Sequence, residues 1–133
     1  MFAAMLFAIS IIALSQFGIF YWRAILSGVA AQPVSARVLE SANVDAAGLS
    51  AQHFPVMSKL HELTADLHPG TGGLGVVRFY YQAVRTAGLL GKYFPGVAAW
   101  SERERTICAR YAAVQIDRRL QANLALCASL RSC

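Results

Sequence analysis

The chain is short of charged residues. Only 14% of its 133 residues are Asp, Glu, Lys or Arg, well below the roughly 25% of an ordinary soluble domain. The shortage is local, because the first 22 residues carry no charged side chain. Residues 1–33 hold 24 apolar residues, whereas residues 34–133 hold 51, which is an average globular composition. The length allows one small domain and makes two improbable.

Other scarcities exclude whole classes of protein. Three cysteines and four prolines rule out a disulfide scaffold and a collagen-like repeat, and the apolar content of 56% rules out a disordered chain. No second long apolar run follows the first, so a polytopic membrane protein is not expected. The sequence also lacks convincing alternation of apolar and polar residues and any hairpin signal, and it therefore predicts no sheet.

What is present is one long apolar segment. At about 1.5 Å per residue, residues 1–22 would span roughly 33 Å as a helix, enough for a hydrocarbon core of about 30 Å. The segment ends in Tyr21, Trp22 and Arg23, and rings followed by a cation suit the headgroup region. We predict a transmembrane helix with a short juxtamembrane extension over residues 1–31, anchored at the interface by these three residues.

A cleaved signal peptide is the alternative interpretation. Small residues 28–30 could precede a cleavage site. The segment lacks a basic leading region, however, and its apolar stretch exceeds the 7–15 residues usual in signal peptides. Every Lys and Arg lies at or after Arg23, which by the positive-inside rule puts residues 32–133 in the cytoplasm. The expected location is the bacterial inner membrane, crossed once, with the N-terminus outside.

Three polar or small residues within the apolar segment could mediate helix association. Ser15 and Gly18 would permit close approach of another helix, and Gln16 could hydrogen-bond to it. An amide in the membrane without a partner is costly. The alternative is that the serines bond to their own helix and Gln16 snorkels. We favour an intramembrane contact through Ser15, Gln16 and Gly18.

Residues 32–133 have helical periodicity and predict a small cytoplasmic domain. Helices are expected over about residues 34–42, 55–67, 74–92 and 101–130. Ser101 and Glu104 form a capping-box pattern at the start of the last one. The predicted fold is all-α, one transmembrane helix followed by a bundle of three to four helices. The expected inward positions are Val38 and Leu39; Val56, Leu60, Leu63 and Leu67; Leu74, Val77, Tyr81 and Val84; and Ala109, Ala113, Ile116, Leu120, Leu124 and Cys127.

No motif in the chain indicates catalysis, a cofactor or a metal. Residues 70–75 match G-x-G-x-x-G, but the preceding segment has helical rather than strand periodicity, so a helix connection is favoured. The three histidines, at positions 53, 61 and 68, lack the close spacing of metal ligands and are interpreted as surface or capping residues. Cys127 is expected to be buried, and no carboxylate pair suits acid–base chemistry. We therefore expect no enzymatic activity and no small-molecule substrate.

The basic residues suggest what this domain contacts. The net charge is +5, and Arg78, Arg85 and Lys92 recur every seven residues, which predicts a cationic stripe opposite the apolar seam of residues 74–92. Near a membrane such cations attract anionic lipid headgroups, and Arg also suits acidic partner surfaces. A solvated face is the alternative. The neighbouring aromatic residues are expected to fill the core, with exposed anchors as the alternative; they are Phe79, Tyr80, Tyr81, Tyr93, Phe94 and Trp100.

These features together favour a non-catalytic, single-pass accessory subunit. It would stabilise, position or help assemble a larger inner-membrane complex, with a respiratory or photosynthetic complex as one candidate host. Its partners would be other membrane subunits and anionic headgroups. One alternative is a membrane-tethered basic module for nucleic acid or anionic lipid, although no helix-turn-helix motif supports nucleic acid. The other is a small enzyme with a thiol or histidine site, which no local signature supports.

Overall fold

The structure is a computed structural model that describes residues 1–45, 48–64 and 74–132. All regular secondary structure in these residues is helical, which confirms the predicted all-helical class. The elements are α1 (Phe2–Ala30), α2 (Ala36–Ser41), the 3-10 turn η1 (Ala51–His53), α3 (Phe54–Leu63), α4 (Gly75–Leu89), the 3-10 turn η2 (Leu90–Lys92) and α5 (Pro95–Arg131).

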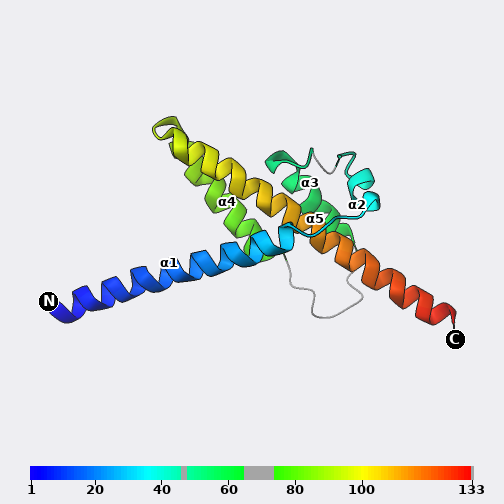
Figure 1. Ribbon diagram of the computed structural model, residues 1–133, viewed down its shortest axis with the longest axis horizontal. Coiled ribbons are helices and arrows are strands. Elements are labelled where there is room, and N and C mark those ends of the chain that lie inside the picture. The colour runs from blue at the N-terminus through cyan, green and yellow to red at the C-terminus, as the bar shows by residue number, and fades with distance from the viewer. Residues whose placement is uncertain (46–47, 65–73, 133) are drawn as a thin grey trace.

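Helix α5 is the centre of the molecule (Figure 1). It has 37 residues, a length of about 55 Å at 1.5 Å per residue, and it contacts α1, α2, α3 and α4. Its middle section carries Ala109, Ala112 and Ala113, all fully buried. Because alanine extends no further than Cβ, other helices can pack closely against α5 along this section.

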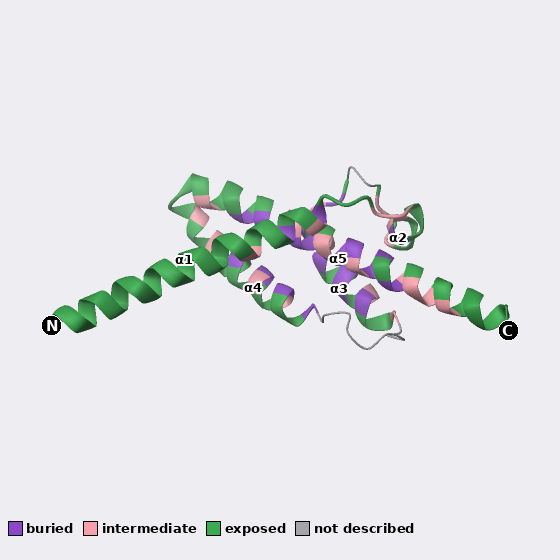
Figure 2. Ribbon diagram, turned by 60° about the horizontal axis from the view of Figure 1, so that its bottom comes forward, coloured by how far each residue is buried: buried purple, intermediate pink, exposed green. Residues whose placement is uncertain are grey.

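Helix α1 has two parts with different surroundings (Figure 2). Residues 1–21 are exposed along their whole length, and they protrude from the rest of the chain. Further along, Leu26 is fully buried and Ala30 nearly so, where α1 crosses α5. Among the described helices, α1 alone is long and apolar enough to cross a membrane.

Helix α3 buries a different face from the one expected. Val56 and Leu63 are exposed, and the buried residues are Phe54, Met57, Ser58 and His61. The ring of Phe54 stacks on Tyr81 of α4, with 4.2 Å between centroids. This aromatic contact and fully buried Met57 orient the helix, and Leu60 packs half-buried against the core as expected. Leu67, the last of the expected inward residues, lies outside the described residues.

The start of the last helix was wrongly predicted. α5 begins at Pro95, which suits the first helical turn because proline lacks an N–H there. Ser101 and Glu104 therefore lie inside the helix and form no capping box. The Ser101 hydroxyl donates to the Val84 carbonyl at 2.9 Å, and Glu104 is buried. Both residues face neighbouring helices.

The far end of α5 also differs from the prediction. Ala109, Ala113 and Ile116 are buried as expected, whereas Leu124 and Cys127 are exposed. The helix continues beyond the bundle in Figure 1, so its last turns have no neighbouring helix to cover their apolar side. The expectation that Cys127 is buried is wrong.

Helices α4 and α5 form a tight antiparallel hairpin through η2. The α4 seam of Leu74, Val77, Tyr81 and Val84 is buried as predicted. Near the turn the two chains come so close that a Cβ on Gly91 would lie 2.7 Å from the Cβ of Ala98 and 3.0 Å from its Cα. Glycine at position 91 is what allows the hairpin to close.

Gly91→Ala is expected to destabilise the hairpin by about 1–3 kcal/mol, the usual cost of overpacking, because the new methyl group meets the backbone of Ala98. Thermal unfolding in detergent micelles, followed by circular dichroism, measures the loss. Gly96→Ala is the matched control, since nothing lies within 4 Å of its Cβ position. Equal melting temperatures for the two variants would contradict the close contact.

Candidate functional site

A buried ion pair joins the base of the apolar helix to the bundle. The Glu104 side chain is 1% exposed, and the guanidinium of Arg23, the first charged residue after the apolar segment, donates to its Oε1. The hydroxyl of Tyr80 on α4 donates to Oε2 at 2.9 Å. A buried carboxylate is tolerated only when it is paired and hydrogen-bonded. Both oxygens of Glu104 have a donor, and α1, α4 and α5 meet at this carboxylate.

Arg23 was expected to act as an anchor in the headgroup region, and the structure adds an ion pair with Glu104. Its side chain remains 44% exposed, so one side of the guanidinium contacts Glu104 and the other reaches solvent. Of the other expected anchors, Tyr21 is exposed, whereas Trp22 is half-buried and packs against the core. The three residues therefore stand where the exposed part of α1 meets the bundle.

The carboxylate also affects two neighbouring acidic groups. Burial, together with the hydrogen bond to Glu104, raises the pKa of the Tyr80 hydroxyl. Burial, and secondarily the negative charge of Glu104, raises the pKa of the Cys108 thiol to about 12. The thiolate is the reactive form of cysteine, so Cys108 is a poor nucleophile near neutral pH. Its environment is the reverse of an activated thiol site.

Cys108 is therefore expected to resist alkylation by iodoacetamide at pH 8 while Cys127 reacts. Cys108 is fully buried and Cys127 is exposed. Mass spectrometry after trypsin digestion separates the two residues, and unfolding in guanidinium chloride should make both reactive. Because the folded state holds Cys108 neutral, stability should also fall as pH rises from 9.0, the ordinary thiol pKa, to about 12. Rapid alkylation of Cys108 in the folded protein would contradict this burial.

The predicted cationic stripe is divided between two roles. Arg78 donates through Nη2 to the carboxylate of Glu62 on α3 and to the Ser58 carbonyl, the latter at 3.3 Å. The hydrogen bond and charge of Arg78 lower the pKa of Glu62. Arg85 and Lys92 are exposed. The stripe lies beside the α4 seam, not opposite it, because Arg78 reaches α3.

The face of α4 opposite its seam is apolar. Val76 is 62% exposed and Phe79 is 78% exposed. Tyr93, Phe94 and Leu90 are also exposed around η2. Of the six aromatic residues expected in the core, Tyr81 is buried and Tyr80 is half-buried, whereas the exposed ones are Phe79, Tyr93, Phe94 and Trp100. The expectation of core burial is wrong for these four residues, and their exposure agrees with the alternative.

The three residues expected to contact a partner helix, Ser15, Gln16 and Gly18, lie on the exposed part of α1. Ser15 donates to the carbonyl of Ile11 in its own helix at 2.7 Å, as the alternative interpretation allowed. A Cβ on Gly18 would find nothing within 4 Å, and Gln16 is exposed. Nothing in the described chain packs against Gly18, so this side of α1 is uncovered.

The histidines divide into three cases. The Nδ1 of His53 lies 3.1 Å from the backbone N–H of Ser50 and caps η1, which agrees with the capping interpretation. His61 is buried, so the expectation of a surface residue was wrong there. His68 and residues 70–73 of the glycine-rich segment lie outside the described residues. Within residues 1–45, 48–64 and 74–132, no cluster of His, Cys, Asp and Glu is suited to hold a metal ion.

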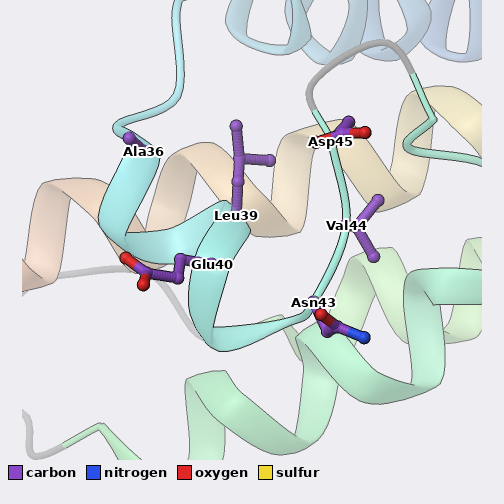
Figure 3. Close-up of a pocket in the computed structure, with 6 residues that line it drawn as sticks. All are labelled: Ala36, Leu39, Glu40, Asn43, Val44 and Asp45. Carbon is purple, nitrogen blue, oxygen red and sulfur yellow. The ribbon is translucent and has the colours of Figure 1, made fainter.

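The described pockets are shallow and carry no catalytic arrangement. One pocket of about 450 Å³ lies beside α2 and is drawn in Figure 3. Glu40 and Asp45 are at opposite ends of it with Leu39 between them, so their carboxylates do not converge. A second pocket, of about 270 Å³, has Lys59, Arg78 and Arg85 in its lining. Of these cations, Arg78 already forms an ion pair with Glu62.

Comparisons with known proteins add no information about the function of this chain. No protein-family model, curated protein or solved structure matches the chain. The sequence did not reveal the pairing of Glu104, and it offered the exposure of the aromatic residues near η2 only as an alternative. A signal for the pairing existed, because Ser101, Glu104, Cys108 and Ala112 recur at helical spacing with one charged member.

Proposed function

We propose that this chain is a non-catalytic, single-pass accessory subunit that stabilises, positions or helps assemble a larger protein complex of a bacterial inner membrane. The observation that carries the proposal is helix α1. Its first 20 residues carry no charged side chain, are apolar except at a few small or polar positions such as Gln16, and are exposed on all sides. Water is a poor solvent for such a surface, whereas a lipid bilayer matches both its length and its composition.

The way in which α1 joins the bundle supports a role in positioning the bundle relative to the membrane. A flexible linker would leave the bundle free to move relative to the membrane. Here α1 continues into the bundle, Leu26 enters its core, and Arg23 pairs with Glu104. These contacts fix α1 to α5, so the bundle would be held at a defined place relative to the span.

The proposed orientation puts residues 32–133 in the cytoplasm and the N-terminus outside. All 12 Lys and Arg residues then lie on the cytoplasmic side or at its boundary, as the positive-inside rule favours. Tyr21, Trp22 and Arg23 would lie at that boundary. Arg85 and Lys92, which are exposed, would contact anionic headgroups, each with about 1 kcal/mol near the surface.

Arg85→Gln with Lys92→Gln is therefore expected to reduce the anionic lipid that remains bound to the protein. Native mass spectrometry of the full chain, released from nanodiscs that contain phosphatidylglycerol, measures the bound lipid. Arg78→Gln is the matched control, because Arg78 already pairs with Glu62 and should lose less lipid. If Arg78→Gln matches the double variant, headgroup contact through Arg85 and Lys92 is excluded.

Within the membrane, the open side of α1 at Ser15, Gln16 and Gly18 is the proposed contact with a partner helix. Small residues let helix backbones approach, and an amide can hydrogen-bond across the contact. Gly18→Leu should block this approach without disturbing the chain itself, since nothing lies near that Cβ position. Ala13→Leu is the control for the Ser15–Gly18 side, because Ala13 is also small and exposed but lies about 140° around the helix from Gly18.

The deciding experiment is purification of the chain from its native membrane in a mild detergent, followed by mass spectrometry of the proteins that accompany it. The proposal expects a reproducible set of membrane subunits with the natural chain and with Ala13→Leu, and a depleted set with Gly18→Leu. Migration as a lone monomer with no reproducible companion would reject the accessory-subunit function.

A further inference from the structure

The end of the α4–α5 hairpin is apolar in sequence and exposed in space. We call residues 89–100, which include η2 and the first turns of α5, the hairpin tip. Its one charged residue is Lys92. Leu89 is 68% exposed, Tyr93 79% and Phe94 63%. Large exposed apolar surfaces on folded proteins mark contacts with membranes, partners or ligands.

The apolar surface extends along one side of α4. Val76 and Phe79 lie on the face opposite the buried seam, and both are exposed. At 100° per residue, Leu90 continues this face into the tip. The uncovered surface therefore runs from the N-terminal turn of α4 to η2, with Thr86 as an exposed polar position within it. It lies beside Tyr80, whose hydroxyl meets Glu104 and, through it, α1.

The direction of the hairpin indicates what covers this surface. In both Figures 1 and 2 the hairpin tip and the exposed part of α1 lie on the same side of the molecule, and the C-terminal end of α5 points the opposite way. The contact between Arg23 and Glu104 ties α5 to the end of the apolar segment. From Glu104 back to Pro95, α5 rises about 14 Å at 1.5 Å per residue. The tip therefore lies on the lipid side of Arg23.

The chemistry of the tip suits the boundary between headgroups and acyl chains. Tyr and Trp are enriched at that depth because their rings are apolar with a polar end. Lys92 has an aliphatic stem that can lie in the apolar region while its ammonium reaches the headgroups. A tip with Tyr93, Trp100 and Lys92 at this depth satisfies both its apolar and its charged groups.

We propose that the hairpin tip inserts into the headgroup–acyl boundary of the leaflet at which α1 emerges, so that the protein holds the membrane at two points. This inference rests on the proposed function in requiring α1 to span the membrane. Interfacial elements bury their apolar face by about 5–10 Å. Two attachment points restrict rotation of the bundle about α1, so that α3 and the distal end of α5 face the cytoplasm in one orientation.

Fluorescence quenching by brominated lipids tests the proposal, because the chain has only two tryptophans, Trp22 and Trp100. The first reporter is Tyr93→Trp in a chain with Trp22→Phe and Trp100→Phe. The second is Trp22 alone, in a chain with Trp100→Phe. Each full chain is placed in nanodiscs that contain phosphatidylglycerol and a lipid brominated near the headgroup end of its acyl chains. Iodide serves as the aqueous quencher.

The proposal expects both reporters to lose emission to the brominated lipid and little to iodide. If the reporter at position 93 is quenched by iodide and not by lipid while Trp22 is quenched by lipid, the tip lies in water and the inference fails, but the anchor stands. If position 93 is shielded from both quenchers, protein covers the tip, and the inference fails in favour of a partner subunit. If neither reporter meets lipid, the membrane anchor fails as well.

A charge variant gives an independent test on the same nanodiscs. Tyr93→Asp with Phe94→Asp should expel the tip, seen as increased access of trypsin to Lys92. Leu124→Asp is the matched control, since Leu124 is exposed on the distal part of α5 and should leave cleavage at Lys92 unchanged. Circular dichroism verifies that the helices persist in both variants. Equal protection of Lys92 in the natural and the double-Asp chains would overturn the insertion.

Discussion

Arg23→Met is expected to destabilise the bundle by about 3 kcal/mol, the lower end of the cost of removing one partner from a buried ion pair. The loss arises because Glu104, which is 1% exposed, would keep a buried negative charge with Tyr80 as its remaining donor. The lower end applies because Arg23 is 44% exposed, so water screens part of its attraction. Methionine retains most of the aliphatic stem and isolates the effect of the charge.

Removing the charge of Glu104 should lower the free energy of unfolding by less than removing the charge of Arg23. Glu104→Gln retains an oxygen that can accept from Arg23 or Tyr80, and the cation left behind is partly solvated. The double variant, Arg23→Met with Glu104→Met, should recover much of the loss, since apolar residues of similar volume often replace a buried pair without penalty. Free energies of unfolding in mixed micelles supply this double-mutant cycle.

The exposed ion pair of Arg105 with Glu102 on α5 is the matched control. Exposed pairs contribute about 0–1 kcal/mol, so Glu102→Gln should leave the free energy of unfolding nearly unchanged. If Arg23→Met and Glu102→Gln have equal small effects, Glu104 is not a buried carboxylate that depends on Arg23, and the junction between α1 and the bundle is held by packing alone.

Helix content and the apolar segment could be predicted because both are local properties of the sequence. The seam of α4, from Leu74 to Val84, follows directly from helical spacing, and its members are buried. The exposed apolar length of α1 follows from the absence of charge before Arg23. In these places one physical rule determines the outcome, so periodicity and composition are sufficient.

Local sequence left the position of Glu104 undecided, because a capping box and a buried helical stripe both include Ser101 and Glu104. Ser101 and Glu104 have the spacing of a capping box, and Glu at the start of a helix is favourable. The structure instead continues the helix back to Pro95 and buries both residues. What decides between the two is Arg23, which lies 81 residues away, and no local window contains it.

The aromatic residues around η2 illustrate a second limit. Hydrophobicity indicates that Tyr93 and Phe94 avoid water, but it does not say whether a protein core or a membrane receives them. α4 has a buried face and an exposed apolar face, so the usual division into apolar inside and polar outside fails. The position of the tip relative to α1 supplies the missing information, and it is a property of the tertiary arrangement.

The second large effect concerns α1 itself. Ile12→Arg with Leu14→Arg is expected to release the chain from the membrane fraction. Each arginine at the centre of a span costs about 2.5–3.5 kcal/mol of insertion free energy, whereas each Leu, Ile or Phe contributes only about 0.3–0.6. Two arginines therefore offset the contribution of the remaining large apolar residues in residues 2–21. Alkaline carbonate extraction of membranes, followed by sedimentation, measures the fraction that stays embedded.

The same charge placed outside α1 tests whether the effect depends on the span. Leu63→Arg with Leu130→Arg adds two arginines at positions that are 74% and 68% exposed and far from the apolar segment, so this variant should remain embedded. Retention of the Ile12→Arg, Leu14→Arg chain in carbonate-washed membranes would mean that α1 is not what holds the protein there. Attachment would then fall to the hairpin tip or to a partner, and residues 2–21 would need protein rather than lipid to cover them.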